Sequence, residues 1–360
     1  MKMVTVIGAR PQFIKAATIS RVIADTQGVE EILLHTGQHF DENMSHVFFS
    51  ELDIPEPQYN LGIGGGSHGA MTGRQLEAIE AVLLKEKPDW VLVYGDTNST
   101  LAGALAAVKL HIPVAHVEAG LRSFNRAMPE EINRVLTDHA ADLLFAPTES
   151  ALANLEKEGL VGKASLSGDV MYDAALFYAD RSEERSNILG ELGLNSGEFI
   201  LSTIHRAENT DDPDRIATVV SAMQELGAER DIVFPLHPRT RISLEKLGVL
   251  EKLSSSVILI EPVGYLDMVM LEKHACLIVT DSGGVQKEAF FHKVPCVTIR
   301  DETEWVELLG LGWNRLVSQP NTKDLSAVCS AAIGTEGQMG KPYGDGCSAN
   351  KILQTLVDSY

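Results

Sequence analysis

The chain has 360 residues, of which 44% are hydrophobic and 6% aromatic, and its formal net charge is −20. This composition is typical of a soluble globular protein, and the length favours two domains over one. The negative charge argues against a sequence-independent nucleic-acid binder, which needs a basic surface. Four cysteines without a CxxC pair indicate reduced thiols. The apolar run at residues 4–7 is too short for a signal peptide, and no run reaches membrane-spanning length, so we expect a cytoplasmic protein.

Short apolar runs alternate with segments of helical periodicity along the chain. This alternation is the pattern of parallel sheets covered by helices on both faces. The runs that predict strands are residues 4–7, 31–36, 90–94, 114–117, 143–146, 199–203, 231–236, 257–260, 277–280 and 294–299. The helical segments include residues 75–87, 100–110, 129–140 and 213–226.

The alternation forms two successive units, so we predict an α/β fold with two doubly wound, Rossmann-like domains. The boundary is expected near residues 167–173, which gives an N-terminal domain of residues 1–169 and a C-terminal domain of residues 170–345. A last helix at residues 349–357 follows a stretch rich in glycine and polar residues. We assign residues 346–360 to the first domain.

Ligands of open parallel sheets bind outside the carboxyl ends of the strands, so the residues that follow each strand are the first candidates. After the first strand come Arg10 and, one helical turn further, Lys15, with Pro11 at the helix start. This arrangement suits an anion at a helix N-terminus, although two solvated surface cations would give the same pattern.

Carboxylates follow the third and fourth predicted strands. Asp96 fits two interpretations, a cap of the next helix and a catalytic group. Glu118 follows residues 114–117 and is less easily explained by capping.

The helix at residues 129–140 begins with Pro129, Glu130 and Glu131. Acidic residues in a first turn are favoured by the helix dipole, so one of the two glutamates is expected to be structural. Arg134 lies one turn beyond Glu130 and is spaced to pair with it.

In the second domain, His205 follows residues 199–203 and stands beside Arg206. It is a candidate acid, base or phosphate contact, and a solvated loop is the alternative. His237 follows residues 231–236, and we interpret it as structural. The spacing of His, Cys and carboxylate residues predicts no metal site, and no nucleophile elbow or Walker-type loop is present in the sequence.

The sequence DSGGVQKE at residues 281–288 follows a buried apolar strand and opens a helix. A Ser-Gly-Gly turn exposes backbone N–H groups at the positive end of that helix, so we predict a bound nucleotide diphosphate. Glu288 is expected near the first turn, facing back toward the turn. A tight turn that needs glycine for steric reasons alone is the alternative.

Six short motifs in one order together resemble the non-hydrolysing UDP-N-acetylglucosamine 2-epimerases, and they span nearly the whole chain. They are GARP at residues 8–11 with Lys15, GDT at 95–97, HVEAGLR at 116–122, PEE at 129–131 with Asn133 and Arg134, HRAEN at 205–209, and TDSGG at 280–284 with Gln286 and Glu288.

The resemblance implies a glycosyltransferase-B architecture with a UDP-sugar in the cleft between the domains, a homodimer, and no metal or redox cofactor. It also implies an elimination–addition reaction. Loss of the C2 proton and of UDP from C1 gives 2-acetamidoglucal, and UDP re-addition with protonation on the other face inverts C2. Such chemistry needs carboxylates with tuned pKa values and cations that stabilise the departing pyrophosphate.

By the same resemblance, Asp96, Glu118 and Glu130 are the acid/base groups, supported by Arg134, and His205 is similar to an essential histidine near the pyrophosphate. The other implied substrate contacts are Arg10 and Lys15, the phosphate-binding Ser282, Gly283 and Gly284, Glu288 on the ribose, and Val263 and Met268 in the segment that holds uracil.

Three positions depart from the family pattern. Trp305 stands where members that act on UDP-N-acetylglucosamine have arginine, a form that resembles the branch acting on UDP-2,3-diacetamido-2,3-dideoxyglucuronate. Met268 replaces a frequent aromatic, and methionine also packs on flat rings. The regulatory-site motif reads QHFD at residues 38–41 and keeps only its first glutamine, so activation by substrate is not expected to carry over.

We therefore predict a UDP-N-acetylglucosamine 2-epimerase, with the diacetamido-uronate as the alternative substrate. A retaining glycosyltransferase of the same architecture is a more remote alternative, and the set of three carboxylates argues against it. A nucleotide-sugar-binding protein and a hydrolysing epimerase remain open.

Overall fold

The computed structural model describes residues 1–38, 55–319 and 321–360, except for the side chain of Arg10. Residues 39–41 of the expected regulatory motif lie outside the described residues. The chain divides into two compact units, one formed by Met1–Ala174 with Lys341–Tyr360 and the other by Ala175–Gly340. Within the described residues, no helix is both long and apolar enough to cross a membrane.

The first unit contains a parallel sheet of seven strands in the order β3-β2-β1-β4-β5-β6-β7. Its central strands are apolar and buried on both faces, as parallel sheets require. The strands are β1 (Lys2–Ile7), β2 (Glu30–His35), β3 (Tyr59–Asn60), β4 (Trp90–Tyr94), β5 (Val114–Val117), β6 (Leu143–Ala146) and β7 (Ala164–Leu166).

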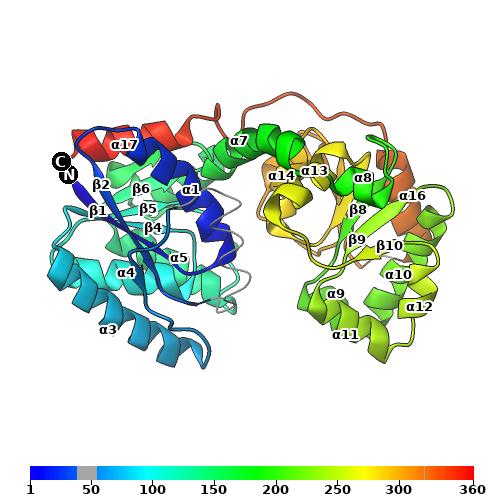
Figure 1. Cartoon of the computed structure of the whole chain (residues 1–360), viewed down its shortest axis with the longest axis horizontal. Helices are drawn as coiled ribbons and strands as arrows, with labels where there is room; N and C mark the ends of the chain where they lie inside the picture. Colours follow the sequence, from blue (N-terminus) through cyan, green and yellow to red (C-terminus); the bar gives the residue numbers. More distant parts are fainter. Residues whose placement is uncertain (39–54, 320) are drawn as a thin grey trace. The chain divides into compact units, whose positions relative to one another are not determined.

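Helices cover both faces of this sheet. Figure 1 shows α1 and α17 together on one face and α3, α4 and α5 on the other. The helices of this unit are α1 (Arg10–Ala24), α3 (His68–Glu86), α4 (Asn98–Lys109), α5 (Pro129–Ala140), α6 (Glu149–Lys157) and α17 (Ser348–Asp358), with a short 3-10 turn η1 at Val161–Lys163. Helix α7 (Val170–Arg185) begins in this unit and ends in the other.

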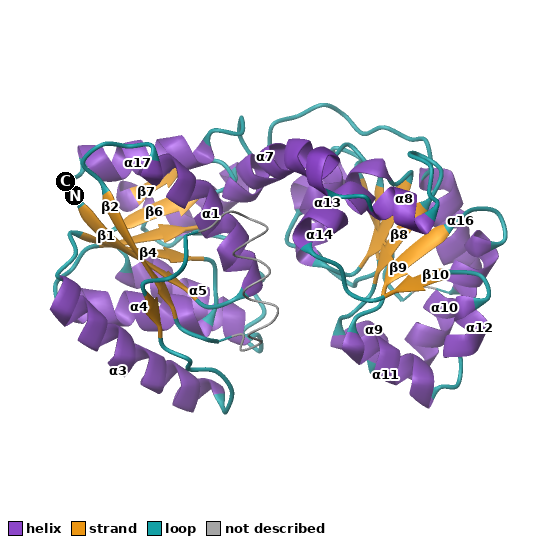
Figure 2. Ribbon diagram, viewed as in Figure 1, coloured by secondary structure: helices purple, strands orange, loops and turns teal. Residues whose placement is uncertain are grey.

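The second unit repeats this design with a parallel sheet of six strands in the order β10-β9-β8-β11-β12-β13. Figure 2 shows these strands enclosed by helices. The strands are β8 (Ile200–Thr203), β9 (Ile232–Pro235), β10 (Ile258–Ile260), β11 (Leu277–Thr280), β12 (Cys296–Thr298) and β13 (Asn314–Leu316).

Alternate residues of β8 belong to two core clusters, Ile200 to one and Leu201 to the other. Successive strand residues point to opposite faces, so the two clusters lie on opposite sides of the sheet. The helices are α8 (Ile188–Leu192), α9 (Ala207–Thr210), α10 (Pro213–Gly227), α11 (Pro238–Lys246), α12 (Leu250–Ser254), α13 (Tyr265–His274), α14 (Gly283–Phe291), α15 (Val306–Gly310) and α16 (Thr322–Ala332).

The predicted α/β fold with two doubly wound sheets is confirmed, because both strand orders reverse direction next to the first strand of the unit. All ten predicted strands are present, with ends shifted by two residues at most. Strands β3, β7 and β13 were not predicted. The strand order reverses between β1 and β4 in the first sheet and between β8 and β11 in the second. Ligand-binding loops are expected at these two places.

Candidate active site

In the first unit, the loops that follow β1 and β4, together with the start of α5, enclose a cavity of about 210 Å³. Its lining includes three of the predicted site residues, namely Lys15, Asp96 and Glu130. Gly8 lets the first loop approach the second, because a Cβ at this position would lie 2.2 Å from Ser99 Oγ.

Glu118 lies at the end of β5 and pairs with two cations. Lys15 Nζ is 2.5 Å from Glu118 Oε2, and Arg134 Nη2 is 3.3 Å from Glu118 Oε1. The side chains of Lys15 and Glu118 are each only 9% exposed. Charges buried to this degree need partners, and Lys15 and Arg134 supply two for Glu118.

Arg134 also contacts Asp96, with Nη2 2.6 Å from Asp96 Oδ2. One guanidinium therefore bridges two of the predicted catalytic carboxylates. Burial would lower the pKa of Arg134, but Asp96 and Glu118 together raise it above its ordinary value. The expected pairing of Arg134 with Glu130 is replaced by these two contacts.

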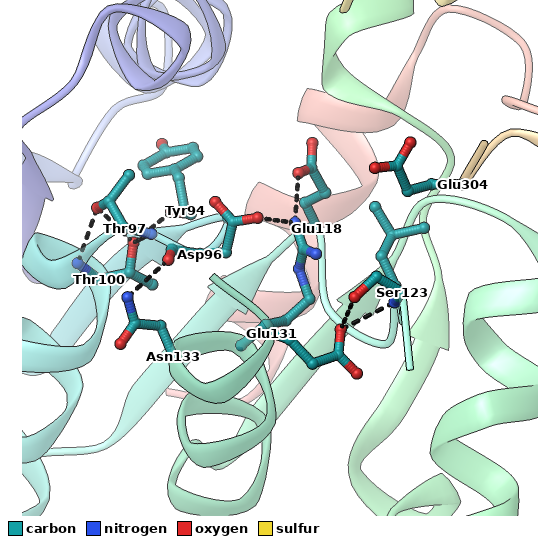
Figure 3. Close-up of polar contacts among 12 residues, drawn as sticks. Tyr94, Asp96, Thr97, Thr100, Glu118, Ser123, Glu131, Asn133 and Glu304 are labelled. Atoms are coloured by element: carbon teal, nitrogen blue, oxygen red, sulfur yellow. Dashed lines mark hydrogen bonds and ion pairs between the residues drawn. The ribbon is translucent and has the colours of Figure 1, made fainter. Parts of the chain in front are cut away.

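The interpretation of Asp96 as a helix cap is wrong. The cap of α4 is Thr97, whose hydroxyl accepts a hydrogen bond from the Thr100 N–H at 3.2 Å. The carboxylate of Asp96 is therefore available for chemistry at the cavity. Its backbone is fixed from α5, because Asn133 Nδ2 donates to the Asp96 carbonyl at 3.0 Å (Figure 3).

The two adjacent glutamates of α5 have different surroundings. Glu131 is buried and accepts hydrogen bonds from the backbone N–H and the hydroxyl of Ser123, at 2.8 and 2.9 Å (Figure 3). Glu130 is exposed and lines the cavity. Glu131 is thus the structural glutamate that holds the loop before α5, and Glu130 is the one positioned for chemistry.

Gln12 connects the loops after β1 and β4. Its side-chain carbonyl accepts from the N–H groups of Gly8 and Ala9, and its amide donates to the Tyr94 carbonyl at 2.8 Å. It is 2% exposed. Nothing in the sequence pointed to this role, since a glutamine in a first helical turn is ordinary.

In the second unit, Ser282 precedes the first turn of α14, and its side chain makes no capping hydrogen bond. Ser282 and Gly283 are partly exposed and Gly284 is exposed, while the Ser282 N–H donates to Thr280 Oγ1 at 2.9 Å, so the first turn of α14 is open to solvent at its glycines. A helix N-terminus of this form suits a phosphate group.

Trp305 packs against this turn. Its indole Nε1–H donates to the Gly283 carbonyl at 2.9 Å, and Lys287 Nζ lies 4.1 Å from the centre of the ring. The side chain is 7% exposed. Trp305 thus supports the backbone of the turn at residues 282–284 from within the second unit.

Asp281 orients the loop that carries His205. This fully buried carboxylate accepts from the N–H groups of His205 and Arg206 and from Asn209 Nδ2, at distances between 2.9 and 3.1 Å. Its Oδ1 also lies 3.4 Å from His205 Nδ1. The imidazole of His205 is 40% exposed and remains accessible to a ligand.

The remaining predicted contacts lie on or near α13 and α14. Glu288 is buried, with Oε1 3.5 Å from the hydroxyl of Tyr265, and Oε2 lies 3.9 Å from where a Cβ on Gly284 would be. It therefore faces back toward the turn. Val263 and Met268 are half-buried at the edge of the core. His237 caps α11, because its Nδ1 accepts from the Arg239 N–H in the first turn at 3.2 Å, which is compatible with the structural interpretation.

The family model of UDP-N-acetylglucosamine 2-epimerase matches residues 21–357. The chain is 53% identical over 361 residues to the UDP-2,3-diacetamido-2,3-dideoxy-D-glucuronate 2-epimerase of Pseudomonas aeruginosa, covering 99% of each chain. It is similar to the crystal structure of Methanocaldococcus jannaschii UDP-GlcNAc 2-epimerase in complex with UDP-GlcNAc and UDP, with 46% identity, a TM-score of 0.89, and 99% and 100% of the two chains covered.

The Neisseria meningitidis UDP-GlcNAc 2-epimerase bound to UDP-GlcNAc is also similar, with 31% identity, a TM-score of 0.90, and 99% and 100% of the two chains covered. The chain therefore belongs to the UDP-N-acetylglucosamine 2-epimerase family. Both the resemblance noted in the sequence and the fold of two Rossmann-like domains, of glycosyltransferase-B type, are confirmed.

Proposed function

We propose that this enzyme interconverts UDP-N-acetylglucosamine and UDP-N-acetylmannosamine without hydrolysis. The observation that carries the proposal is the pair of carboxylates Asp96 and Glu118, bridged by Arg134, beside a cavity that Glu130 also lines. Membership of the family supports it. Inversion at C2 needs proton transfer on both faces of the sugar, and several carboxylates at one cavity can supply it.

The reaction proceeds by elimination and re-addition. A carboxylate takes the C2 proton, the C2–H electrons form the C1–C2 double bond, and the C1–O bond breaks to release UDP. UDP then adds back to C1 of the 2-acetamidoglucal while a carboxylic acid delivers a proton to the other face of C2. Lys15 and Arg134 supply positive charge beside the carboxylates, and the acid/base set is Asp96, Glu118 and Glu130.

We assign UDP recognition to the second unit. The turn at Ser282, Gly283 and Gly284 is proposed to bind the diphosphate and Glu288 the ribose hydroxyls. His205 is proposed to stabilise the departing pyrophosphate, because its imidazole is accessible and its loop is held by Asp281. Val263 and Met268 are proposed to contact uracil. From the first unit, Arg10 is proposed as a further anion contact, as the family motif implies.

An incubation with UDP-N-acetylglucosamine in D2O tests the reaction. We expect UDP-N-acetylmannosamine with deuterium at C2, since the protonated carboxylate exchanges with solvent. Free UDP and N-acetylmannosamine as the first products would establish a hydrolysing enzyme instead. Transfer of the sugar to an acceptor without deuterium at C2 would establish a glycosyltransferase.

A Glu118→Gln variant separates the enzyme from a binding protein. We expect kcat to fall at least about 100-fold, because acid/base groups contribute factors of this size, while UDP still binds. Unchanged function of the variant would favour a nucleotide-sugar-binding protein.

A second substrate, UDP-2,3-diacetamido-2,3-dideoxyglucuronate, is favoured by Trp305 and by the Pseudomonas aeruginosa relative named for that sugar. The ratio of kcat/KM for the two purified UDP-sugars decides between them. Turnover of neither sugar would contradict both assignments. A homodimer and a cytoplasmic location accompany the proposal, and sedimentation of the purified protein tests the first.

A further inference from the structure

Beneath the carboxylates of the first unit lies a histidine that the reaction does not use directly. His116 is on β5, two residues before Glu118, and its side chain is fully buried. Its Nδ1 lies 2.7 Å from Asp138 Oδ1, and its Nε2 lies 2.7 Å from the backbone carbonyl oxygen of Gly95. Each ring nitrogen is therefore at short hydrogen-bond distance from an oxygen.

Both of these oxygens are acceptors. A backbone carbonyl has no proton to donate, and Asp138 is ionised, because it accepts from the Gly120 N–H at 3.0 Å and from Arg122 Nη2 at 2.7 Å. Burial would raise the pKa of Asp138, but His116 and Arg122 hold that pKa below its ordinary value. A neutral imidazole has only one N–H, so the two short contacts require the imidazolium.

The charges of the surrounding cluster support the same protonation state. The cluster contains four carboxylates, of Asp96, Glu118, Asp138 and Glu158, and the basic side chains of Lys15, Arg122 and Arg134, with His139 also 3.3 Å from Glu158. Buried charges are tolerated when they are balanced by partners. A protonated His116 adds a cation directly beside Asp138, the most buried of these carboxylates.

The two hydrogen bonds of His116 hold the backbone on either side of the site, next to Asp96 and Glu118, the two carboxylates that Arg134 bridges. Through Nε2 the ring holds the carbonyl of Gly95, the residue directly before Asp96. Through Nδ1 it holds Asp138, whose other oxygen holds the N–H of Gly120, two residues after Glu118. Glu118 has a φ of +71°, a left-handed conformation that a non-glycine residue adopts only when its surroundings enforce it.

We propose that His116, held as an imidazolium between Asp138 and the Gly95 carbonyl, is a positioning residue that fixes Asp96 and Glu118 relative to each other. This inference rests on the proposed epimerase function. Acid/base groups act within a narrow range of distances, and a misplacement of about 1 Å costs about 100-fold in rate. A buried ion pair that only stabilises the fold would not have this effect on turnover.

The protonation state is tested in the wild-type protein, with selectively 15N-labelled histidine and NMR of the ring nitrogens. We expect both ring nitrogens of His116 to carry protons in the active enzyme, and the signal to be assigned by its loss in a His116→Gln variant. A neutral His116 ring in an active enzyme overturns this proposal alone. A wild-type protein without epimerase activity overturns the proposed function.

Two variants that each retain one of the two donors test the positioning role. His116→Gln places an amide nitrogen near the former Nε2, where it can still donate to the Gly95 carbonyl but not to Asp138. His116→Asn places an amide nitrogen near the former Nδ1, where it can still donate to Asp138 but not to the Gly95 carbonyl. We expect each variant to lower kcat about 100-fold with little change in KM or in UDP affinity, because each breaks one of the two bonds through which His116 holds Asp96 and Glu118.

UDP affinity, measured by calorimetry, shows whether the second unit is intact, because most of the proposed UDP contacts lie there, and circular dichroism with urea denaturation is the control for folding of the first unit. A kcat that is unchanged in either variant, or losses that only follow the fraction of folded protein, would contradict a positioning role. The NMR measurement on the wild-type protein decides the protonation state even if both variants fail to fold.

Discussion

At the scale of single residues, the adjacent glutamates Glu130 and Glu131 have different roles, one proposed in the chemistry and one in the structure. Glu130 and Glu131 both stand in the first turn of α5, where the helix dipole favours acidic groups. Only Glu131 is buried and hydrogen-bonded to the preceding loop, and only Glu130 lines the cavity. The direction of each side chain, and not its charge, therefore decides which one is available to a substrate.

A Glu130→Gln variant is expected to lower kcat about 100-fold or more, as for loss of an acid/base group. The matched control is Glu149→Gln, because Glu149 is also an exposed glutamate in the first turn of a helix of the same unit. Each change removes a similar helix-dipole interaction of about 0.5 kcal/mol. Steady-state kinetics of both variants checks the prediction, and equal activities would refute the assignment of Glu130.

An Asp281→Asn variant is expected to destabilise the second unit by about 3 kcal/mol. Three donors converge on this fully buried carboxylate, and an amide cannot accept from all of them. Because the loop of His205 would lose its anchor, kcat should also fall. Urea denaturation and kinetics test both effects, and a variant with wild-type stability would show that the loop is held by other contacts.

The sequence predicts the candidate catalytic residues that directly follow a strand. It does not predict the residues that hold them in place from other parts of the chain. Asp96 and Glu118 were singled out because carboxylates at the ends of parallel strands need an explanation. Gln12, His116 and Asp138 were not, because a polar residue within a helix or strand resembles many others until its partners are known. Their roles depend on contacts between residues far apart in the chain.

At the scale of elements, α17 completes the core of the first unit. It packs against α1 with a buried face that includes Ile352, Leu353 and Leu356. The opposite face carries the exposed residues Lys351, Gln354 and Asp358, and Val357, also exposed, lies at the margin between the two faces. A helix with one apolar face is stable only while that face is covered, so α1 and α17 depend on each other.

A Leu356→Ala variant is expected to lower the free energy of unfolding by about 3 kcal/mol, as for other fully buried leucines. Val357→Ala, one residue further on the same helix, should change it by less than about 0.5 kcal/mol, since Val357 is 40% exposed. Chemical denaturation measures both values. Equal effects of the two substitutions would contradict the described orientation of α17.

The elements that the sequence did not predict lie at the margins of the sheets. β3 has two residues, β7 has exposed positions, and β13 is only partly buried, so none shows the apolar run of a central strand. The helix predicted at residues 75–87 corresponds to α3, which begins earlier, at His68. Gly69 and Gly73 in its first turns have low helix propensity and concealed this start.

At the scale of the whole molecule, ligand stabilisation tests where UDP binds. UDP at 100 times its dissociation constant should stabilise the folded protein by about 2.7 kcal/mol. Differential scanning calorimetry should show the increase, and uridine at the same concentration should give a smaller one, because it lacks the diphosphate proposed to bind at the turn before α14. Equal stabilisation by uridine would contradict a phosphate site at this turn.

The division of the chain has a consequence for its synthesis. The second unit is one continuous segment, Ala175–Gly340, whereas the first is assembled from Met1–Ala174 and Lys341–Tyr360. On the ribosome, the apolar face of α1 is therefore made long before α17, the helix that covers it. Until the whole second unit has been translated, the nascent first unit displays an uncovered hydrophobic surface, which is the kind of surface that chaperones bind.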